Sequence, residues 1–219
     1  LQYMNSGHQT YNNVAIFVPV NTGRYTSAVF FAREKNDYAP MERQILALEK
    51  YICVDQEKPV YQIINNRGID YGLFLCYEFT DINARALYKD KVDIIFAPEH
   101  NRDTSYFSNI IETTARDLHV FIVQANTSIY GDSRITGPFG RNDRNVLQIK
   151  GGDKDDIIIG TIELGKVKKY QKDEKVNFDN KIQEYLNYNR NQKYEEEQKL
   201  FEEQKVKIAK TSARFGSNV

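Results

Sequence analysis

The stretch from Tyr71 to Asp81, YGLFLCYEFTD, contains the side chain best suited to covalent chemistry, Cys76. An apolar run ends at this cysteine, and a polar turn then leads to a helix that we expect to begin near Asp81. A cysteine on a strand-to-helix turn lies at the edge of a sheet, where backbone N–H groups of the turn can bind an oxyanion. Helix N-termini also lower thiol pKa values. Cys76 is therefore a candidate nucleophile, with a buried structural thiol as the alternative.

The surroundings of Cys76 contain a set of motifs in a fixed order. Its own motif, G-x-x-x-C-Y-E, consists of Gly72, Cys76, Tyr77 and Glu78. Three segments follow it: KVDIIFAP at 91–98, ETTARDLHVFIVQAN at 112–126, and GDS at 131–133. In this order and spacing, the chain resembles the carbon–nitrogen hydrolase (nitrilase) superfamily over roughly residues 12–165.

The resemblance implies a lysine and two glutamates besides the cysteine. An expected strand at 27–31 is followed by KNDYAPME, so Lys35 and Glu42 stand where the family has its lysine and one glutamate. By this resemblance Lys35 stabilises the oxyanion of the tetrahedral intermediate, and Glu42 positions the substrate or assists proton transfer. Without it, Lys35 would be interpreted as a surface lysine and Glu42 as an acid at a helix N-terminus.

The family's other glutamate, its general base, lies well upstream of the lysine. Here no Asp or Glu occurs from Leu1 to Arg33, and Glu34 adjoins Lys35 too closely to be that residue. Either the base belongs to N-terminal elements that are missing from this sequence, or the site is degenerate. We favour missing elements, because the chain opens with Leu and the sandwich is shorter than the family's domain.

The resemblance also indicates a substrate pocket and a reaction. We expect Tyr77, Glu78 and Glu99 to line the pocket, Glu99 because it follows the strand after the nucleophile. The implied function is a cysteine hydrolase that cleaves a non-peptide C–N bond, an amide or a nitrile, through a thioester. This chemistry requires no metal or organic cofactor, and no His/Cys spacing in the sequence is typical of a zinc site.

The elements that must position these residues come from hydrophobic patterning. Helices are expected at 41–53, 81–88 and 107–118, where apolar residues recur at helical spacing or an N-cap is present. Strands alternating with helices indicate an α/β layered domain, and the resemblance specifies a nitrilase-like α-β-β-α sandwich. The expected strands are 14–20, 27–31, 60–64, 71–76, 92–97, 120–124, 146–149 and 157–162.

The sequence changes character near residue 165. We expect residues 1–165 to form the nitrilase-like domain, without its N-terminal elements, and residues 166–219 to form a charged helical tail. Within the tail, 178–210 is one long helix by propensity, with a partial apolar stripe. The helix is either a solvated appendage or a partner helix that holds an oligomer or a neighbouring domain. The stripe consists of Phe178, Ile182, Tyr185 and Leu186.

Composition excludes several classes of protein. With 41% hydrophobic and 27% charged residues, the chain is neither disordered as a whole nor a membrane protein. Thirty basic and thirty acidic residues cancel, which does not support general binding to nucleic acid. Two cysteines are too few for a disulfide framework and fit a cytoplasmic location.

A second class of function stays open beside the hydrolase. The domain can instead be a non-catalytic or regulatory module for assembly within a larger protein, such as the C-terminal nitrilase domain of a bacterial antiviral-defence reverse transcriptase. No polymerase motif such as Y-x-D-D occurs in this sequence. For either function we expect a homo-oligomer, because nitrilase sandwiches commonly pair through a helical layer.

Overall fold

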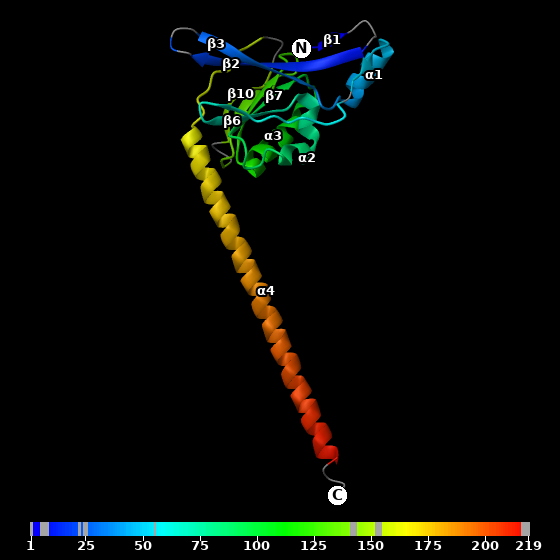
Figure 1. The fold of residues 1–219 in the computed structure, drawn as a ribbon, viewed down its shortest axis with the longest axis vertical. Helices are drawn as coiled ribbons and strands as arrows, with labels where there is room; N and C mark the ends of the chain where they lie inside the picture. Colours follow the sequence, from blue (N-terminus) through cyan, green and yellow to red (C-terminus); the bar gives the residue numbers. More distant parts are fainter. Residues whose placement is uncertain are drawn as a thin grey trace. The chain divides into compact units, whose positions relative to one another are not determined.

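The computed structural model describes residues 2–4, 9–21, 23, 26–54, 56–140, 144–151 and 155–215. The chain divides into two compact units, Leu1–Lys169 and Tyr170–Val219, and each is described by itself below. In the first unit, the described residues form two β-sheets, helices at Pro40–Leu48, Ile82–Ala86 and Thr104–Leu118, and the start of the C-terminal helix (Figure 1). This unit carries the candidate site.

The larger sheet has six strands in the order β10-β9-β8-β7-β6-β5. Its centre is parallel: β6 pairs with β7, and β7 pairs with β8, so the carboxyl ends of these three strands meet at one edge. The outer strands pair antiparallel. The six strands are β5 Ile64–Asn66, β6 Ile69–Leu73, β7 Ile94–Glu99, β8 Phe121–Asn126, β9 Ser133–Thr136 and β10 Asn145–Ile149.

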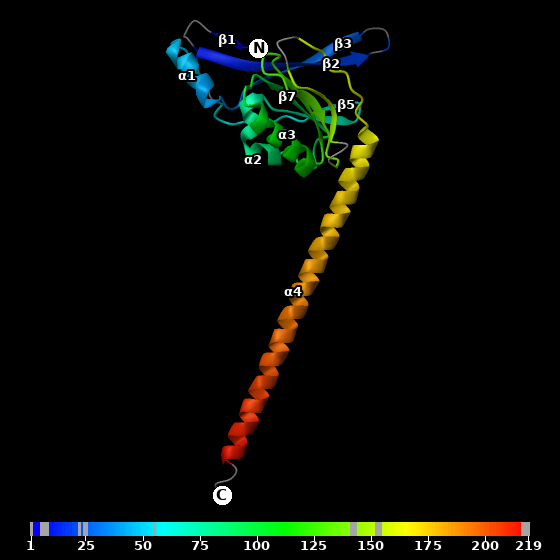
Figure 2. The ribbon, with the colours of Figure 1, turned by 180° about the vertical axis from the view of Figure 1, so that it is seen from behind.

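The smaller sheet is built around a long hairpin. Strands β2 (Gln9–Asn21) and β3 (Thr26–Glu34) pair antiparallel, while β1 (Gln2–Met4) and β4 (Ile52–Cys53) both pair with β2. The hairpin lies across one side of the larger sheet, and the helices α2 and α3 lie on the other side, as both views show (Figures 1 and 2). Helix α1 (Pro40–Leu48) lies beside β1.

The core lies between the larger sheet and α3 (Thr104–Leu118). Ile111 on the helix is fully buried, as are Ile95 on β7 and Ile122 on β8, because every second residue of these strands faces the helix. The near-continuous apolar runs of β7 and β8 are typical of strands covered on both faces. The structure therefore has the layered α/β architecture that the sequence predicted.

Helix α2 (Ile82–Ala86) begins where the sequence placed an N-cap. The side chain of Asp81 accepts a hydrogen bond of 2.8 Å from the backbone N–H of Asn83, which satisfies one free donor of the first turn. The preceding residues, Cys76–Thr80, form a short 3₁₀ turn, η1. The expected strand-to-helix connection is therefore present, with a 3₁₀ turn between the two elements.

Several expected elements differ from the structure. The strand expected at 157–162 is wrong: residues 155–163 are irregular and pair with no strand among the described residues, and Ile157 and Ile159 are 81% and 86% exposed. A strand persists only where a neighbour pairs with its backbone groups. The helix expected at 41–53 ends at Leu48, so Cys53 lies in β4 rather than in a helix. The strand expected at 60–64 begins only at Ile64.

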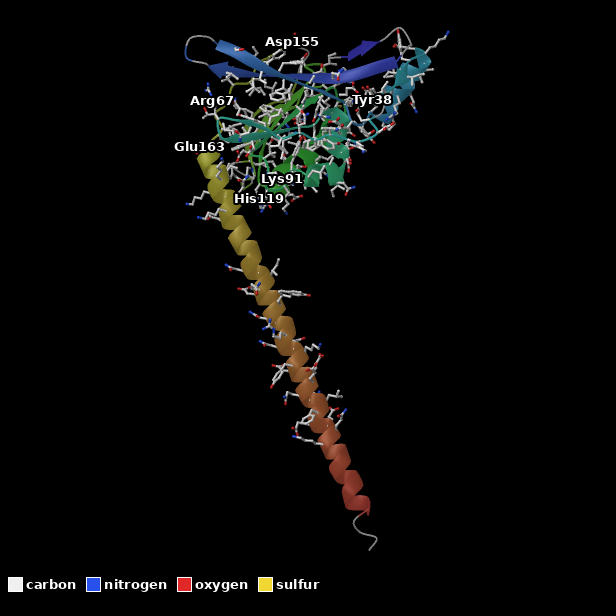
Figure 3. All side chains as sticks on the ribbon, viewed as in Figure 1. Tyr38, Arg67, Lys91, His119, Asp155 and Glu163 are labelled. Carbon is white, nitrogen blue, oxygen red and sulfur yellow. The ribbon has the colours of Figure 1, made fainter. Side chains whose placement is uncertain are left out.

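The long C-terminal helix α4 spans Leu164–Phe215, directly after Glu163 (Figure 3). Its first turns belong to the first unit. There Val167 is fully buried, and Lys168 Nζ donates a hydrogen bond of 3.2 Å to the carbonyl oxygen of Gly68. In the second unit, Ile182, Tyr185 and Leu186 are exposed to solvent, and the side chain of Phe178 lies outside the described residues. No helix among the described residues combines the length and the apolar character needed to cross a membrane.

Candidate active site

Cys76 sits on a strained turn at the carboxyl edge of the larger sheet. The chain leaves β6 at Leu73 and enters η1 at Cys76, whose φ of 48° lies in the left-handed region. This conformation is uncommon for a residue with a Cβ, although five other non-glycine residues of the described chain also have a positive φ. Cys76 thus stands on a tight strand-to-helix turn, as the nucleophile of an elbow motif does, but its thiol is partly buried.

Glu78 holds this turn in place from two residues further on. Its carboxylate is fully buried and accepts hydrogen bonds from Arg33 Nη1 at 2.8 Å and from Arg33 Nη2 at 2.7 Å. It also accepts from the backbone N–H of Leu75 at 2.8 Å and from that of Asn36. These bonds tie η1 to the end of β3, so that two different sheets meet at the thiol.

The carboxylate of Glu78 therefore faces protein donors. Its place in a substrate pocket stays a prediction, and so does that of Tyr77, which is half-buried beside the thiol-bearing residue. The fork of Arg33 matches a carboxylate in a bidentate pair, which fixes the geometry more firmly than a single bond. Sequence reasoning missed Arg33, because nothing in the sequence connects it with a glutamate 45 positions away.

Lys35 and Glu42 form a partly buried ion pair close to the end of β3. Lys35 is 3% exposed, and its Nζ lies 2.5 Å from Glu42 Oε2. Glu42, in the first turn of α1, also accepts 3.2 Å hydrogen bonds from Asn12 Nδ2 and from the backbone N–H of Ala39. The lysine is thus not a surface residue, and its ammonium group is held by a defined partner.

The thiol of Cys76 lies within the electrostatic influence of three of the four charged side chains predicted for the site, those of Lys35, Glu42 and Glu99. Its burial is the largest effect and raises the pKa of Cys76 above its ordinary value; the charges of Glu99 and Glu42 raise it further. A contact of Sγ with the carbonyl oxygen of His100, at 4.0 Å, and the positive charge of Lys35 act in the opposite direction. The expectation of a lowered thiol pKa is wrong. Burial raises the pKa of Cys76 by more than the single short turn η1 can lower it.

Glu99 ends β7 and is 9% exposed. Its Oε2 accepts a hydrogen bond of 2.9 Å from Gln124 Nε2, whereas its Oε1 is buried and has no hydrogen-bond partner among the described residues. Burial raises the pKa of Glu99 from 4.5 to about 7, although the bond from Gln124 and the charge of Arg134 lower it. The negative charge of Asp132 raises it.

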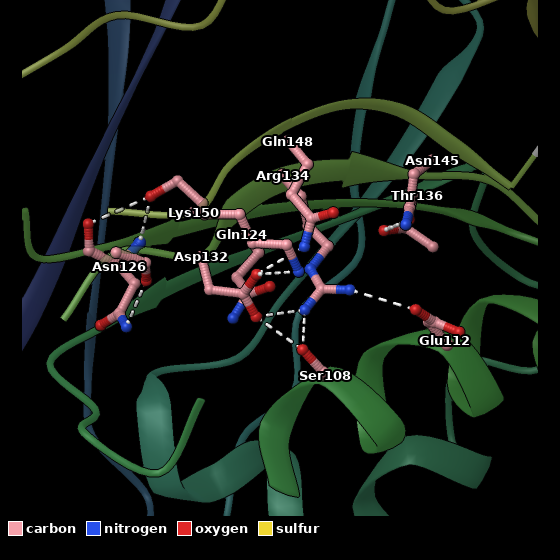
Figure 4. Close-up of polar contacts among 12 residues, drawn as sticks. Ser108, Glu112, Gln124, Asn126, Asp132, Arg134, Thr136, Asn145, Gln148 and Lys150 are labelled. Carbon is pink, nitrogen blue, oxygen red and sulfur yellow. Dashed lines mark hydrogen bonds and ion pairs between the residues drawn. The ribbon is translucent and has the colours of Figure 1, made fainter. Parts of the chain in front are cut away.

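A network of polar groups lies between α3 and the larger sheet (Figure 4). Arg134 is 1% exposed; it pairs with Asp132, bonds Ser108 Oγ and lies 3.3 Å from Glu112 Oε1. Burial acts to raise the pKa of Asp132, but hydrogen bonding from Ser108 and the charge of Arg134 bring it below its ordinary value. Sequence reasoning missed this network, because no element was expected around Arg134, which lies on the short strand β9.

Two cavities lie near the sheets. One, of about 510 Å³, is lined by β8, β9 and the segment 155–158, and includes Asn126 and Ser128. The other, of about 380 Å³, lies between β2 and the larger sheet and includes Phe17 and Phe96. Cys76 lines neither of them in the part of the chain that the structure describes. Among the same residues, no group of three His, Cys, Asp or Glu side chains is placed to hold a metal ion.

The two-sheet sandwich with its strained cysteine is the nitrilase-like α-β-β-α fold of the carbon–nitrogen hydrolase superfamily. A CN-hydrolase superfamily protein from Xanthomonas campestris, solved with an arsenic adduct in its active site, superposes with a TM-score of 0.53 at 11% identity. The match covers 73% of this chain and 65% of that one. No family model matches the sequence, and no curated protein matches it.

Two further solved structures resemble this chain. A branch 10 member of the nitrilase superfamily from Saccharomyces cerevisiae has a TM-score of 0.48 at 12% identity, with 70% of this chain and 55% of that one covered. An amidase of the nitrilase superfamily from Nesterenkonia has a TM-score of 0.45 at 17% identity, with 64% and 58% covered. The chain thus spans 55% to 65% of the lengths of these three proteins.

Proposed function

We propose that this chain carries the cysteine site of a hydrolase that cleaves a non-peptide C–N bond, an amide or a nitrile, through a thioester. The observation that carries the proposal is the placement of Cys76 on a tight turn with positive φ, under the electrostatic influence of the Lys35–Glu42 pair, whose lysine is buried. This arrangement supplies a thiol nucleophile and a cation for the developing oxyanion; the reaction also requires a carboxylate for proton transfer.

Each residue has a defined role in the proposed reaction. The sulfur of Cys76 attacks the carbonyl or nitrile carbon, and the Nζ of Lys35 stabilises the negative charge that develops on the oxygen or nitrogen. Glu42, which is bonded to Lys35 at 2.5 Å, orients this ammonium group and contacts the substrate. Tyr77 and Glu99 line the pocket on the side of the larger sheet. No metal or organic cofactor takes part.

The proposal is tested by trapping the acyl-enzyme. The chain is incubated with short aliphatic amides and nitriles, ammonia release is measured, and the acyl adduct is sought by intact-mass spectrometry after acid quenching. The Cys76→Ala variant should lose both signals, while the Cys53→Ala variant, which removes the other free thiol, should keep them. Adducts that persist in Cys76→Ala, or that map to Cys53, would contradict the assignment.

A second candidate function is assembly within a larger protein, and exposed apolar surface favours it. On β2 and β3, Phe17 and Phe30 are 66% and 56% exposed, with ring centroids 5.2 Å apart. We propose that residues 1–165 form one nitrilase-like domain, that it forms homo-oligomers and that 166–219 is a helical tail. A defence reverse transcriptase is one such larger protein. The sequence of the full open reading frame tests which function applies. An upstream strand that ends in Glu would support the hydrolase, and polymerase motifs would support the fusion.

We also propose a cytoplasmic location for the protein. Neither Cys53 nor Cys76 forms a disulfide in the structure, and a thiol nucleophile persists in a reducing compartment. Fractionation of cells that express the full reading frame, with detection by an antibody against the first unit, tests this location. Recovery of the protein outside the cytoplasmic fraction would contradict it.

A further inference from the structure

The buried thiol of Cys76 needs a proton acceptor before it can attack. Because burial raises its pKa, the sulfur is protonated at neutral pH, whereas the thiolate is the nucleophilic form. Among the described residues, the carboxylates that act electrostatically on this thiol are those of Glu42 and Glu99. The structure separates these two candidates by what their oxygens contact.

Both oxygens of Glu42 already accept hydrogen bonds. Its Oε2 lies 2.5 Å from Lys35 Nζ and accepts from the backbone N–H of Ala39, and its Oε1 accepts from Asn12 Nδ2. A proton on this carboxylate would remove the charge that strengthens its bond to the ammonium group of Lys35. It is suited to holding the lysine and poorly suited to accepting a further proton.

Glu99 has the free oxygen that Glu42 lacks. Gln124 holds its Oε2 at 2.9 Å, which fixes the carboxyl group, while the buried Oε1 has no hydrogen-bond partner among the described residues. An unpartnered buried oxygen costs free energy unless a ligand, a water molecule or a proton occupies it. The following residue, His100, brings its carbonyl oxygen to 4.0 Å from Cys76 Sγ, so the end of β7 reaches the thiol.

We propose that Glu99 is the proton acceptor for the Cys76 thiol, directly or through one water molecule, an inference that rests on the proposed hydrolase function. In the acylation of an amide, the S–H bond breaks, the proton passes to Glu99 Oε1, and the sulfur electron pair forms the bond to the carbonyl carbon. Glu99 then gives this proton to the leaving nitrogen as the C–N bond breaks. In deacylation, water loses its proton to Glu99, its oxygen attacks the thioester, and the departing sulfur regains the proton.

The charges around Glu99 suit this role. The positive charge of Arg134 lowers the pKa of Glu99, and the negative charge of Asp132 raises it. The bonds of Arg134 to Ser108 and Glu112 on α3 hold the arginine in place. The pKa of Glu99, about 7, lies where a carboxyl group can both accept and return a proton near neutral pH. Above pH 7 the carboxyl group is ionised and can accept a proton, and below pH 7 it is already protonated.

The test uses iodoacetamide as the probe, in a Cys53→Ala background in which Cys76 is the single thiol. The alkylation rate is measured from pH 5.5 to 9 for this protein and for the added substitutions Glu99→Gln and Glu99→Asp. We expect the rate to rise with a midpoint near pH 7, following the ionisation of Glu99. Glu99→Gln should lose this rise and react about tenfold more slowly at pH 7.5, in line with the loss of one proton-transfer group. Glu99→Asp should keep part of the rise.

The sign of the change separates the proposal from its alternative. If the carboxylate of Glu99 merely repels the thiolate, Glu99→Gln lowers the thiol pKa and alkylation becomes faster, which would overturn the proposal. An alkylation profile without an inflection between pH 6 and 8 in the Cys53→Ala protein would overturn it as well, even if Glu99→Gln does not fold. If Cys76 resists alkylation altogether, the hydrolase function itself fails. If Cys76 reacts and Glu99→Gln leaves the rate unchanged, only the role of Glu99 fails.

Discussion

Replacing Glu99 by Gln should change how the stability of the first unit depends on pH. In the folded protein the pKa of Glu99 is about 7, against an ordinary value of 4.5. At about 1.36 kcal/mol for each unit of difference, the ionised carboxylate costs the folded state about 3 kcal/mol. Glu99 is 9% exposed, so solvent screening reduces this figure only slightly. Glutamine carries no charge at any pH and resembles the protonated acid in shape.

The direction of the effect follows from proton binding. Between pH 4.5 and 7 the folded state holds the proton of Glu99 and the unfolded state has lost it, so the free energy of unfolding decreases as pH rises. This stability is fully present below pH 4.5 and is lost as pH rises through 7. The wild-type protein and Glu99→Gln should therefore have similar stability at pH 5, and the variant should be more stable by about 3 kcal/mol at pH 8.

Urea unfolding at pH 5, 6, 7 and 8 measures this difference. The chain has 15 Tyr and no Trp, so tyrosine fluorescence reports the tertiary packing of the first unit, where most of the tyrosines lie. Glu57→Gln is the matched control, because this glutamate is exposed and its replacement should leave the pH dependence as it is in the wild type. Unfolding free energies of wild type and Glu99→Gln that run parallel from pH 5 to 8 would refute a raised pKa at Glu99.

Three further predictions concern packing and the tail. Gly72→Ala should destabilise the first unit by about 1–3 kcal/mol in urea unfolding, because the added Cβ would lie 2.8 Å from the buried ring of Tyr88. In the control Gly140→Ala, the added Cβ meets no atom within 4 Å, so this change should have little effect. Arg33→Met should cost about 3–5 kcal/mol by leaving the buried charge of Glu78 unpaired; a loss below 1 kcal/mol would contradict the clamp. Deleting 178–210 should lower the number of chains per particle, measured by light scattering, while the first unit stays folded. An unchanged number of chains would indicate a solvated appendage.

Local patterns predicted much of the first unit. The apolar runs that became β2, β3, β7 and β8 were found from β-branched and aromatic content, and the N-cap at Asp81 from one side chain. These features depend on residues near one another in the chain. The short strands β1 and β9 were missed, since three or four residues carry little periodicity of their own.

The features that could not be predicted depend on distant partners. Whether 157–162 is a strand depends on a neighbour that pairs with it, and no local pattern reports that neighbour. The pKa of Cys76 depends on how deeply the turn is buried, which the sequence of the turn does not determine. The free oxygen of Glu99 likewise follows from the position of Gln124 on the adjacent strand. Sequence placed Glu99 near the site, but only the structure distinguishes it from Glu42.

The G-x-x-x-C-Y-E motif can now be explained position by position. Gly72 leaves room for the ring of Tyr88, so that β6 and the chain after α2 approach closely. Cys76 takes up the left-handed conformation at the start of η1, just after the strand ends. Glu78 ties this turn to the end of β3 through Arg33 and two backbone amides. The glutamate two positions after the cysteine is therefore the residue that holds the turn in place.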